Sequence, residues 1–267
     1  MPKATLIDGK KLAEDILLNV KKEVDNLSTK PGLSAILVGD NEASKIYLKL
    51  KEKACLQTGI NFHSYIIQDD CPEAKILEVI NFLNNDPETT GIMVQLPLPA
   101  KYNTNQIINA IAPLKDVDGF HPQTKLTSPN ILGIIELIKA TGVNVKNKQI
   151  TVISNSEIFS QPFKKLLPDS QVEYLSPQIQ SSALKTQCQK ADVLIVAVGQ
   201  ANFIKPNMVK KDAILIDVGI NKVKGKTVGD IDPGCDKVAS WRSPVPGGVG
   251  PMTVAMLLKN LIHIEQK

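Results

Sequence analysis

SAILVGDNEASKIYLKLKEKACLQTG, residues 34–59, contains one complete unit of the fold: a buried strand, a turn and a helix. Residues 34–39 form an apolar run without the alternation of polar side chains that a half-exposed strand would have. Residues 39–41 (GDN) are a turn signal, and helical spacing of apolar side chains follows over 43–58. A strand that leads directly into a helix is the repeating unit of α/β proteins.

The same unit recurs along the chain. Buried or partly buried strands are predicted at 34–39, 61–67, 91–98, 149–153, 192–199 and 213–220. Helices are predicted at 10–27, 43–58, 72–84, 104–111, 130–141, 160–167, 179–190 and 252–265. Because strands and helices alternate, we expect an α/β fold with two lobes of mainly parallel sheets and a cleft between them. The second lobe is expected to be Rossmann-like.

A domain boundary is predicted in residues 113–122 (PLKDVDGFHP), which are rich in proline, glycine and aspartate. The chain has 267 residues, and single cores rarely grow much beyond ~250. We therefore expect a catalytic lobe at 1–118, completed by the C-terminal helix 251–267, and a second lobe at 119–250.

Composition excludes several classes of protein. Hydrophobic residues make up 43% and charged residues 22%, as in ordinary globular chains, and no apolar run reaches the ~18 residues of a membrane span. The net charge of +4 and an aromatic content of 4% argue against a nucleic-acid surface. No C-x-x-C occurs and the three histidines are scattered, so we expect no metal site. The cysteines are expected to be reduced thiols of a cytoplasmic protein: Cys55, Cys71, Cys188 and Cys235.

Chemically suggestive residues gather in the first half. Tyr47 and Lys51 are four apart and project from one helix face. Gln95 interrupts the apolar run 91–99 (GIMVQLPLP) just before two prolines, where a strand must leave its sheet. Asp118 lies in a K-D-V-D-G turn sequence. Taken singly, each also fits an ordinary structural role, such as a lysine lying over a tyrosine ring or an aspartate in a turn.

Four blocks change that interpretation: 38–59 (VGDNEASKIYLKLKEKACLQTG), 94–99 (VQLPLP), 115–122 (KDVDGFHP) and 244–253 (PVPGGVGPMT). In this order and spacing they closely resemble the methylenetetrahydrofolate dehydrogenase/methenyltetrahydrofolate cyclohydrolase family, over essentially the whole chain. The resemblance implies oxidation of 5,10-methylenetetrahydrofolate with NADP, followed by hydrolysis of the methenyl product to 10-formyltetrahydrofolate. It also implies a cytoplasmic homodimer, with no nucleic acid, membrane or metal partner.

The resemblance implies that Tyr47, Lys51, Gln95 and Asp118 are catalytic. A free lysine has a pKa of ~10.4, so Lys51 needs burial and a neutral partner such as Gln95 to act near pH 7. Tyr47 is expected to stack on the aminobenzoate ring. Asp118 offers two oxygens to the amino and ring N–H groups of the pterin. Substrate binding is implied for Tyr47, Gln95 and Asp118 together with Pro246, Gly247 and Gly248.

The dinucleotide loop departs from the family pattern. The family has G-x-S-x-x-V-G-x-P after the strand that ends near Ile153, whereas this chain has serine at both glycine positions, Ser154 and Ser160. A side chain there is expected to crowd the phosphates, and Glu157 adds a carboxylate beside them. The residues implied to bind the cofactor are Ser154, Asn155, Ser156, Gly199 and Ile220.

Several alternatives therefore stay open on the sequence alone. The cofactor is NADP, NAD or neither, since 173–177 (EYLSP) offers no basic residue for an adenosine phosphate. The protein is then bifunctional, a cyclohydrolase only, or a non-catalytic folate-binding relative. An unrelated dinucleotide dehydrogenase is excluded, because no G-x-G-x-x-G follows Ile153.

Overall fold

The computed structural model describes residues 3–265, which divide into two compact units. Unit 1 contains the described residues up to Leu12 together with Asn130–Thr253, and unit 2 contains Ala13–Pro129 with the chain from Val254 onward. The helices α1 (Gly9–Asp25) and α8 (Val249–Glu265) each begin in unit 1 and continue into unit 2.

Unit 2 is built on a three-stranded parallel sheet in the order β3 (Asn61–Ile67), β2 (Gly32–Val38), β4 (Gly91–Val94). The central strand β2 is buried along its whole length. Because side chains alternate along a strand, Leu33, Ala35 and Leu37 join one hydrophobic cluster and Ile36 and Val38 join another. This explains why the apolar run shows no polar alternation: both faces of the sheet are covered.

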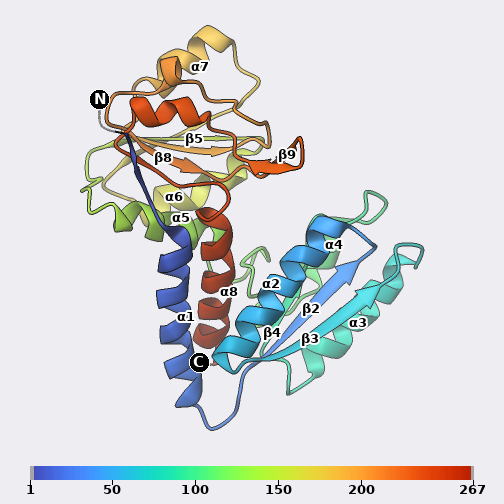
Figure 1. Cartoon of the computed structure of the whole chain (residues 1–267). Helices are drawn as coiled ribbons and strands as arrows, with labels where there is room; N and C mark the ends of the chain where they lie inside the picture. Colours follow the sequence, from blue (N-terminus) through green and yellow to red (C-terminus); the bar gives the residue numbers. More distant parts are fainter. Residues whose placement is uncertain (1–2, 266–267) are drawn as a thin grey trace. The chain divides into compact units, whose positions relative to one another are not determined.

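Helices supply the rest of both clusters. The first cluster includes side chains of α1, α2 (Glu42–Thr58) and α8, and the second includes side chains of α3 (Glu73–Asn85) and α4 (Thr104–Asn109). Val20 and Val24 of α1 and Leu257 and Leu261 of α8 belong to the same cluster, and the two helices lie side by side in Figure 1. The helix α8 thus completes the hydrophobic core of unit 2.

The segment after β4 remains attached to unit 2. Ile92 forms a parallel bridge with Asp116, and the side-chain amide of Asn260 in α8 donates hydrogen bonds of 3.0 Å to the carbonyls of Val117 and Thr127. The division therefore falls after Pro129, later than the boundary predicted after residue 118. The first residues belong to unit 1 because β1 (Thr5–Leu6) pairs with β11 (Trp241–Arg242), a contact between distant parts of the sequence.

Unit 1 contains a six-stranded sheet in the order β1-β11-β8-β7-β5-β6, and every pairing in it is parallel. Its four longer strands are β5 (Gln149–Ser154), β6 (Gln171–Leu175), β7 (Val193–Ala197) and β8 (Ile214–Asp217). From β5 the chain goes to β6 on one side and then returns to β7 on the other. In parallel sheets, ligands bind beyond the carboxyl ends of the strands at such a reversal point.

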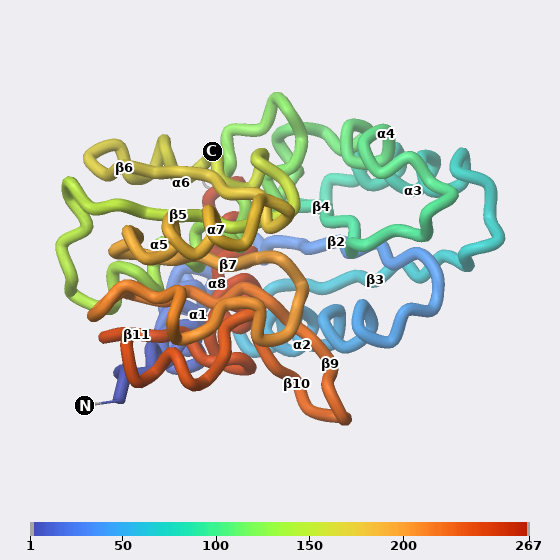
Figure 2. Tube along the Cα trace, turned by 90° about the horizontal axis from the view of Figure 1, so that it is seen from above, coloured from blue at the N-terminus to red at the C-terminus, as the bar shows by residue number. Residues whose placement is uncertain are grey.

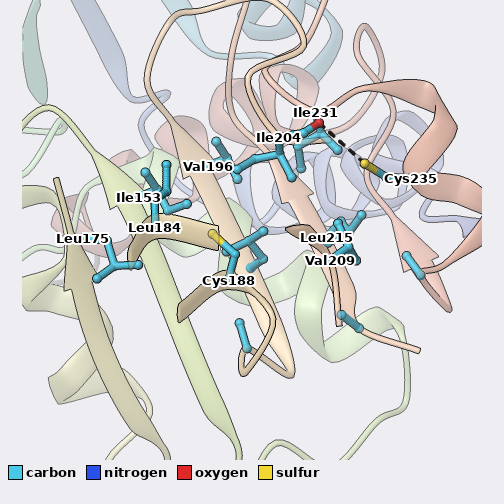
Figure 3. Close-up of a cluster of buried hydrophobic side chains, with 14 of the residues drawn as sticks. Ile153, Leu175, Leu184, Cys188, Val196, Ile204, Val209, Leu215, Ile231 and Cys235 are labelled. Atoms are coloured by element: carbon cyan, nitrogen blue, oxygen red, sulfur yellow. Dashed lines mark hydrogen bonds between the residues drawn. The ribbon is translucent and has the colours of Figure 1, made fainter. Parts of the chain in front are cut away.

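Helices cover both faces of this sheet. Figure 1 shows α7 (Ser181–Cys188) on one face and α5 (Pro129–Ala140) with α6 (Gln161–Leu166) on the other; Figure 2 shows the same unit from above. Figure 3 shows the cluster beneath α7, where Leu184 and Cys188 pack with Ile153 and Val196 of the strands. In the same cluster the Cys235 thiol donates to the carbonyl oxygen of Ile204 at 3.6 Å.

The fold class predicted from the sequence is confirmed, and each predicted strand and helix has a counterpart. The predicted strand 91–98 ends already at Val94, because the following prolines lack the N–H that a ladder needs. The short strands β1 and β11 and the antiparallel hairpin β9 (Asn221–Val223) and β10 (Lys226–Val228) were not predicted. Residues 3–265 contain no helix that is long and apolar enough to cross a membrane.

Candidate active site

The helix α2 carries the predicted lysine and tyrosine. Its N-terminus is capped by Asn41, whose side-chain oxygen accepts a 3.0 Å hydrogen bond from the backbone N–H of Ser44. It ends at Gly59, which adopts a left-handed conformation with φ of 78°. Between these ends, Ser44, Tyr47 and Lys51 follow one another at helical spacing on one face of the helix.

The amine of Lys51 is buried against a neutral partner. Its side chain is 8% exposed, and Nζ donates a 2.6 Å hydrogen bond to Oε1 of Gln95. Nε2 of Gln95 donates to the carbonyl of Leu96 at 2.8 Å, which turns the amide oxygen toward the amine. Burial lowers the pKa of Lys51, while the negative charge of Asp118 acts in the opposite direction. The buried amine of Lys51 therefore loses its proton more readily than the amine of a free lysine.

Asp118 is partly buried and close enough to Lys51 for their charges to interact. Burial raises the pKa of the Asp118 carboxyl to about 6; the positive charge of Lys51 opposes this rise and the charge of Asp116 adds to it. Asp116 itself is bound to the backbone, because its carboxylate accepts the N–H groups of Gly119 (3.1 Å) and His121 (2.8 Å). Asp116 therefore shapes the turn that presents Asp118.

Two further side chains of this site come from α2. Tyr47 is partly buried one turn before Lys51, and burial raises the pKa of its phenol. Ser44 is 2% exposed, and its hydroxyl has no hydrogen-bond partner among the described residues. A buried hydroxyl without a partner is rare and is consistent with a ligand contact. Sequence reasoning did not include Ser44 among the site residues, although its spacing to Tyr47 placed it on the same face.

The predicted substrate residues Pro246, Gly247 and Gly248 lie in unit 1, in the loop before α8. This loop packs backbone to backbone against the start of α1: a Cβ on Gly9 would lie 2.2 Å from the carbonyl oxygen of Gly248. Gly247 has a φ of 106°, a conformation that favours glycine. The contact explains the glycine at position 9, and the role of the loop in substrate binding stays a prediction.

The predicted cofactor residues follow three neighbouring strands of unit 1. Ser154 at the end of β5 pairs with Ala197 of β7, and Val196 pairs with Asp217 at the end of β8. The residues after these strands, including Asn155, Ser156, Gly199 and Ile220, therefore share one edge of the sheet. Gly199 has a φ of 69° and no atom within 4 Å of the position a Cβ would occupy.

The two serines at the family's glycine positions do not project from the turn. Ser154 and Ser160 are 2% and 0% exposed, and their hydroxyls donate to the carbonyls of Ser156 (2.7 Å) and Glu157 (2.8 Å). Asn155 and Ser156 are exposed instead, and the Asn155 amide donates to the carbonyl of Val198 at 3.1 Å. The side chains expected to crowd a diphosphate are thus buried and bonded to backbone carbonyls of the turn.

Comparisons with known proteins identify the family to which both parts of the chain are similar. Residues 7–118 match the family "Tetrahydrofolate dehydrogenase/cyclohydrolase, catalytic domain", and residues 128–267 match the family "Tetrahydrofolate dehydrogenase/cyclohydrolase, NAD(P)-binding domain". The bifunctional protein FolD of Sulfurihydrogenibium sp. is 44% identical over 98% of this chain and 98% of its own length.

Solved structures of the same family have a similar fold. The bifunctional FolD methylenetetrahydrofolate dehydrogenase/cyclohydrolase of Campylobacter jejuni superimposes with a TM-score of 0.93 at 37% identity, covering 98% of this chain and 99% of that one. The FolD enzyme of Trypanosoma brucei, solved with NADP cofactor and inhibitor, has a TM-score of 0.93 at 29% identity, covering 100% of this chain and 98% of that one.

Proposed function

The chain belongs to the tetrahydrofolate dehydrogenase/cyclohydrolase family, and on this premise we propose how its residues perform the two reactions. It oxidises 5,10-methylenetetrahydrofolate with NADP and hydrolyses the resulting methenyl compound to 10-formyltetrahydrofolate. The observation that carries the assignment is the buried Lys51–Gln95 hydrogen bond of 2.6 Å with Asp118 as a charged neighbour. Nothing in the packing of unit 2 requires an amine at this buried position.

Hydrolysis needs a base close to the methenyl carbon. Burial lowers the pKa of Lys51 and so favours its neutral amine, which takes a proton from water as the water oxygen bonds to the cationic carbon. The carbon–N5 bond then breaks as N5 takes up the proton held by the amine. The hydroxyl on the carbon releases its own proton to solvent and becomes the formyl C=O, which stays on N10. Gln95 holds the amine in place without adding a charge that would keep it protonated.

Substrate orientation falls to the groups around Lys51. Above its pKa of about 6, the Asp118 carboxylate accepts hydrogen bonds from the amino and ring N–H groups of the pterin. The partly buried ring of Tyr47 provides a flat face for the aminobenzoate. The unpartnered Ser44 hydroxyl is a further group able to hydrogen-bond substrate or water.

Oxidation uses the edge of the unit 1 sheet. When bound, NADP supplies the acceptor for the hydride that leaves the methylene carbon. Asn155, Ser156, Gly199 and Ile220 are the residues that would hold it, because they follow the strands at the reversal point. Supporting this assignment, Ser154 and Ser160 keep their hydroxyls inside the turn and leave its outer side open.

A homodimer in the cytoplasm is part of the proposal. Within residues 3–265, β6 pairs with β5 alone, so one edge of a half-buried strand is available to the same strand of a second copy. The four cysteines are free thiols, and burial raises the pKa of Cys55, Cys188 and Cys235 to about 12, as suits thiols kept reduced and unreactive.

The proposal is tested with Lys51→Met, which keeps the length of the side chain and removes its amine. Methenyl hydrolysis is expected to fall by about 10²–10⁴-fold, since that is the range that general acid–base groups contribute. The control is Lys49→Met, an exposed lysine of the same helix, which should retain wild-type rates. Full hydrolysis in Lys51→Met would refute the assigned base. NADP reduction by the wild type is followed in the same preparation, and its absence with hydrolysis intact would leave a cyclohydrolase only.

A further inference from the structure

Two buried carboxylates lie near the carboxyl ends of the unit 1 strands, where the cofactor is proposed to bind. Asp217 ends β8, and Asp230 follows the β9–β10 hairpin. Asp217 is 1% exposed and Asp230 is 0% exposed. Burying carboxylates is costly unless hydrogen bonds compensate, so their partners show what the arrangement holds in place.

The Asp230 carboxylate collects the N–H groups of the turn after β7. Oδ2 accepts from Val198 (2.7 Å) and Gly199 (3.0 Å), and Oδ1 accepts from Gln200 (2.9 Å). Oδ1 also accepts from the side-chain amide of Asn221, at 2.9 Å, directly after Ile220. One side chain thus binds the segments that carry both Gly199 and Ile220.

Asp217 holds Asp230 in turn. Its carboxylate accepts the backbone N–H groups of Asp230 and Ile231, both at 2.9 Å, and that of Gly219 at 3.1 Å. Burial raises the pKa of Asp217 to about 6, and the three N–H donors act against this rise. The Asp217 N–H donates to the hydroxyl of Ser243, 2.8 Å away, which directly precedes the loop that begins at Pro244.

Two glycines make this close approach possible. A Cβ on Gly219 would lie 2.1 Å from the carboxylate of Asp230, and a Cβ on Gly229 would lie 1.9 Å from the carboxylate of Asp217. Each carboxylate therefore occupies the space that a side chain on the neighbouring loop would fill, so the loop residue must be glycine. This accounts for the D-V-G and V-G-D sequences at 217–219 and 228–230.

We infer that Asp230 is a positioning residue for the dehydrogenase reaction, acting through the turn Val198–Gln200 and Asn221. The inference rests on the proposed function of this edge. The N–H groups of three consecutive residues of the turn bind Asp230, and the Cβ position of Gly199 in the same turn is open. The Val198 carbonyl then receives the Asn155 amide, which joins the β7 turn to the β5 turn.

An amide at position 230 preserves the shape of the side chain but not its bonding. Asparagine offers one acceptor oxygen, and its NH₂ group would face N–H donors that now bind a carboxylate. Buried donors left without partners drive the turn to rearrange. Displacement by about 1 Å at a reaction site costs on the order of 10²-fold in rate, so the effect on hydride transfer should be large.

The test compares Asp230→Asn with Asp232→Asn in the full-length enzyme. Asp232 lies on the same loop, but its carboxylate binds Gly234 and Lys205 and not the β7 turn. We expect Asp230→Asn to raise the KM for NADP at least about tenfold and to lower the dehydrogenase kcat, with methenyl hydrolysis kept within about twofold. Asp232→Asn should leave both activities unchanged. Hydrolysis needs no dinucleotide and so reports on the integrity of the fold.

An equal loss of both activities in Asp230→Asn would show a purely structural role and overturn the inference, as would an unchanged KM for NADP. If this variant does not fold, Asn221→Ala removes one of the four donors at a half-buried position, and a smaller rise in KM with normal hydrolysis is expected. A wild type without NADP reduction contradicts the proposed function instead. Calorimetric titration with NADP then tests the inference. Weaker binding by Asp230→Asn than by the wild type supports the positioning role. Equal binding by the two proteins, or no binding by the wild type, refutes it.

Discussion

The amine of Lys51 donates a 2.6 Å hydrogen bond to the amide oxygen of Gln95, and both residues are 8% exposed. A neutral acceptor satisfies the buried amine but gives its charged form no ionic stabilisation. Asp118 supplies an opposing charge, whose effect on the pKa of Lys51 is smaller than that of burial. The site thus balances burial, which lowers the pKa of Lys51, against a negative charge that raises it.

Gln95→Glu is expected to upset this balance. A carboxylate in contact with the amine raises the pKa of Lys51 and keeps it protonated near pH 7. Methenyl hydrolysis should fall at least about 10²-fold at neutral pH, and the rise of rate with pH should move to more alkaline pH. The measurement is kcat as a function of pH, with the exposed Gln106→Glu as control. A wild-type pH profile in Gln95→Glu would rule out this role for the amide.

Asp118→Asn should change how stability depends on pH. The pKa of Asp118 is raised from 3.8 to about 6, so the folded protein binds this proton more tightly than the unfolded chain. The wild-type free energy of unfolding therefore loses a contribution as pH rises from about 4 to about 6, and the variant does not. The difference, variant minus wild type, should grow by at most about 3 kcal/mol over that interval.

Urea unfolding at pH 4 and pH 7 measures this difference, with Asp70→Asn, at an exposed position, as control. The sign is the decisive result, because a carboxyl group with a lowered pKa would give a difference that shrinks as pH rises. Folate-dependent activity should be lost in Asp118→Asn at both pH values, as expected for a residue that binds the pterin.

Glu157→Gln is expected to improve NADP binding. Glu157 is exposed in the β5 turn, where the diphosphate is expected, and removing its charge should lower the KM for NADP about two- to fivefold at low salt. The matched variant is Ser154→Gly, which restores a family glycine. Because the Ser154 hydroxyl already bonds to the carbonyl of Ser156 inside the turn, its KM should stay within about twofold. A larger gain from Ser154→Gly would mean that the serine does obstruct the cofactor.

Gly91→Ala should destabilise unit 2. A Cβ there would lie 2.3 Å from Cγ1 of Val117 and 2.6 Å from Cδ1 of Leu261, inside a closed core. Overpacking of this kind costs about 1–3 kcal/mol, to be measured by urea unfolding. The double variant with Val117→Ala makes room and should recover part of the loss. Additive losses in the double variant would contradict the predicted clash.

Local patterns were sufficient to predict the longer helices and strands of this fold, but not the short strands β1, β9, β10 and β11. The helix α2 begins after the capping residue Asn41, within the predicted turn, and ends at Gly59, which has a left-handed conformation. Helical spacing placed Tyr47 and Lys51 on one face of this helix. Such features depend on residues a few positions apart, whose interactions are the same in any α/β protein. The predicted division of the chain was less close, because Asn260 and the β1–β11 pair join residues far apart in sequence.

The sequence by itself determined the alternation of strands and helices, the family, and the identity of Lys51, Gln95 and Asp118 as the candidate catalytic set. Only the tertiary structure decided that Asp116 shapes the turn beside Asp118, that Ser154 and Ser160 turn their hydroxyls inward, and that Asp230 gathers the β7 turn. The physical reason is range. Periodicity and turn formation depend on residues that are close together in the sequence. The direction of a buried polar side chain depends instead on which hydrogen-bond donors and acceptors, distant in the sequence, the folded chain brings close to it.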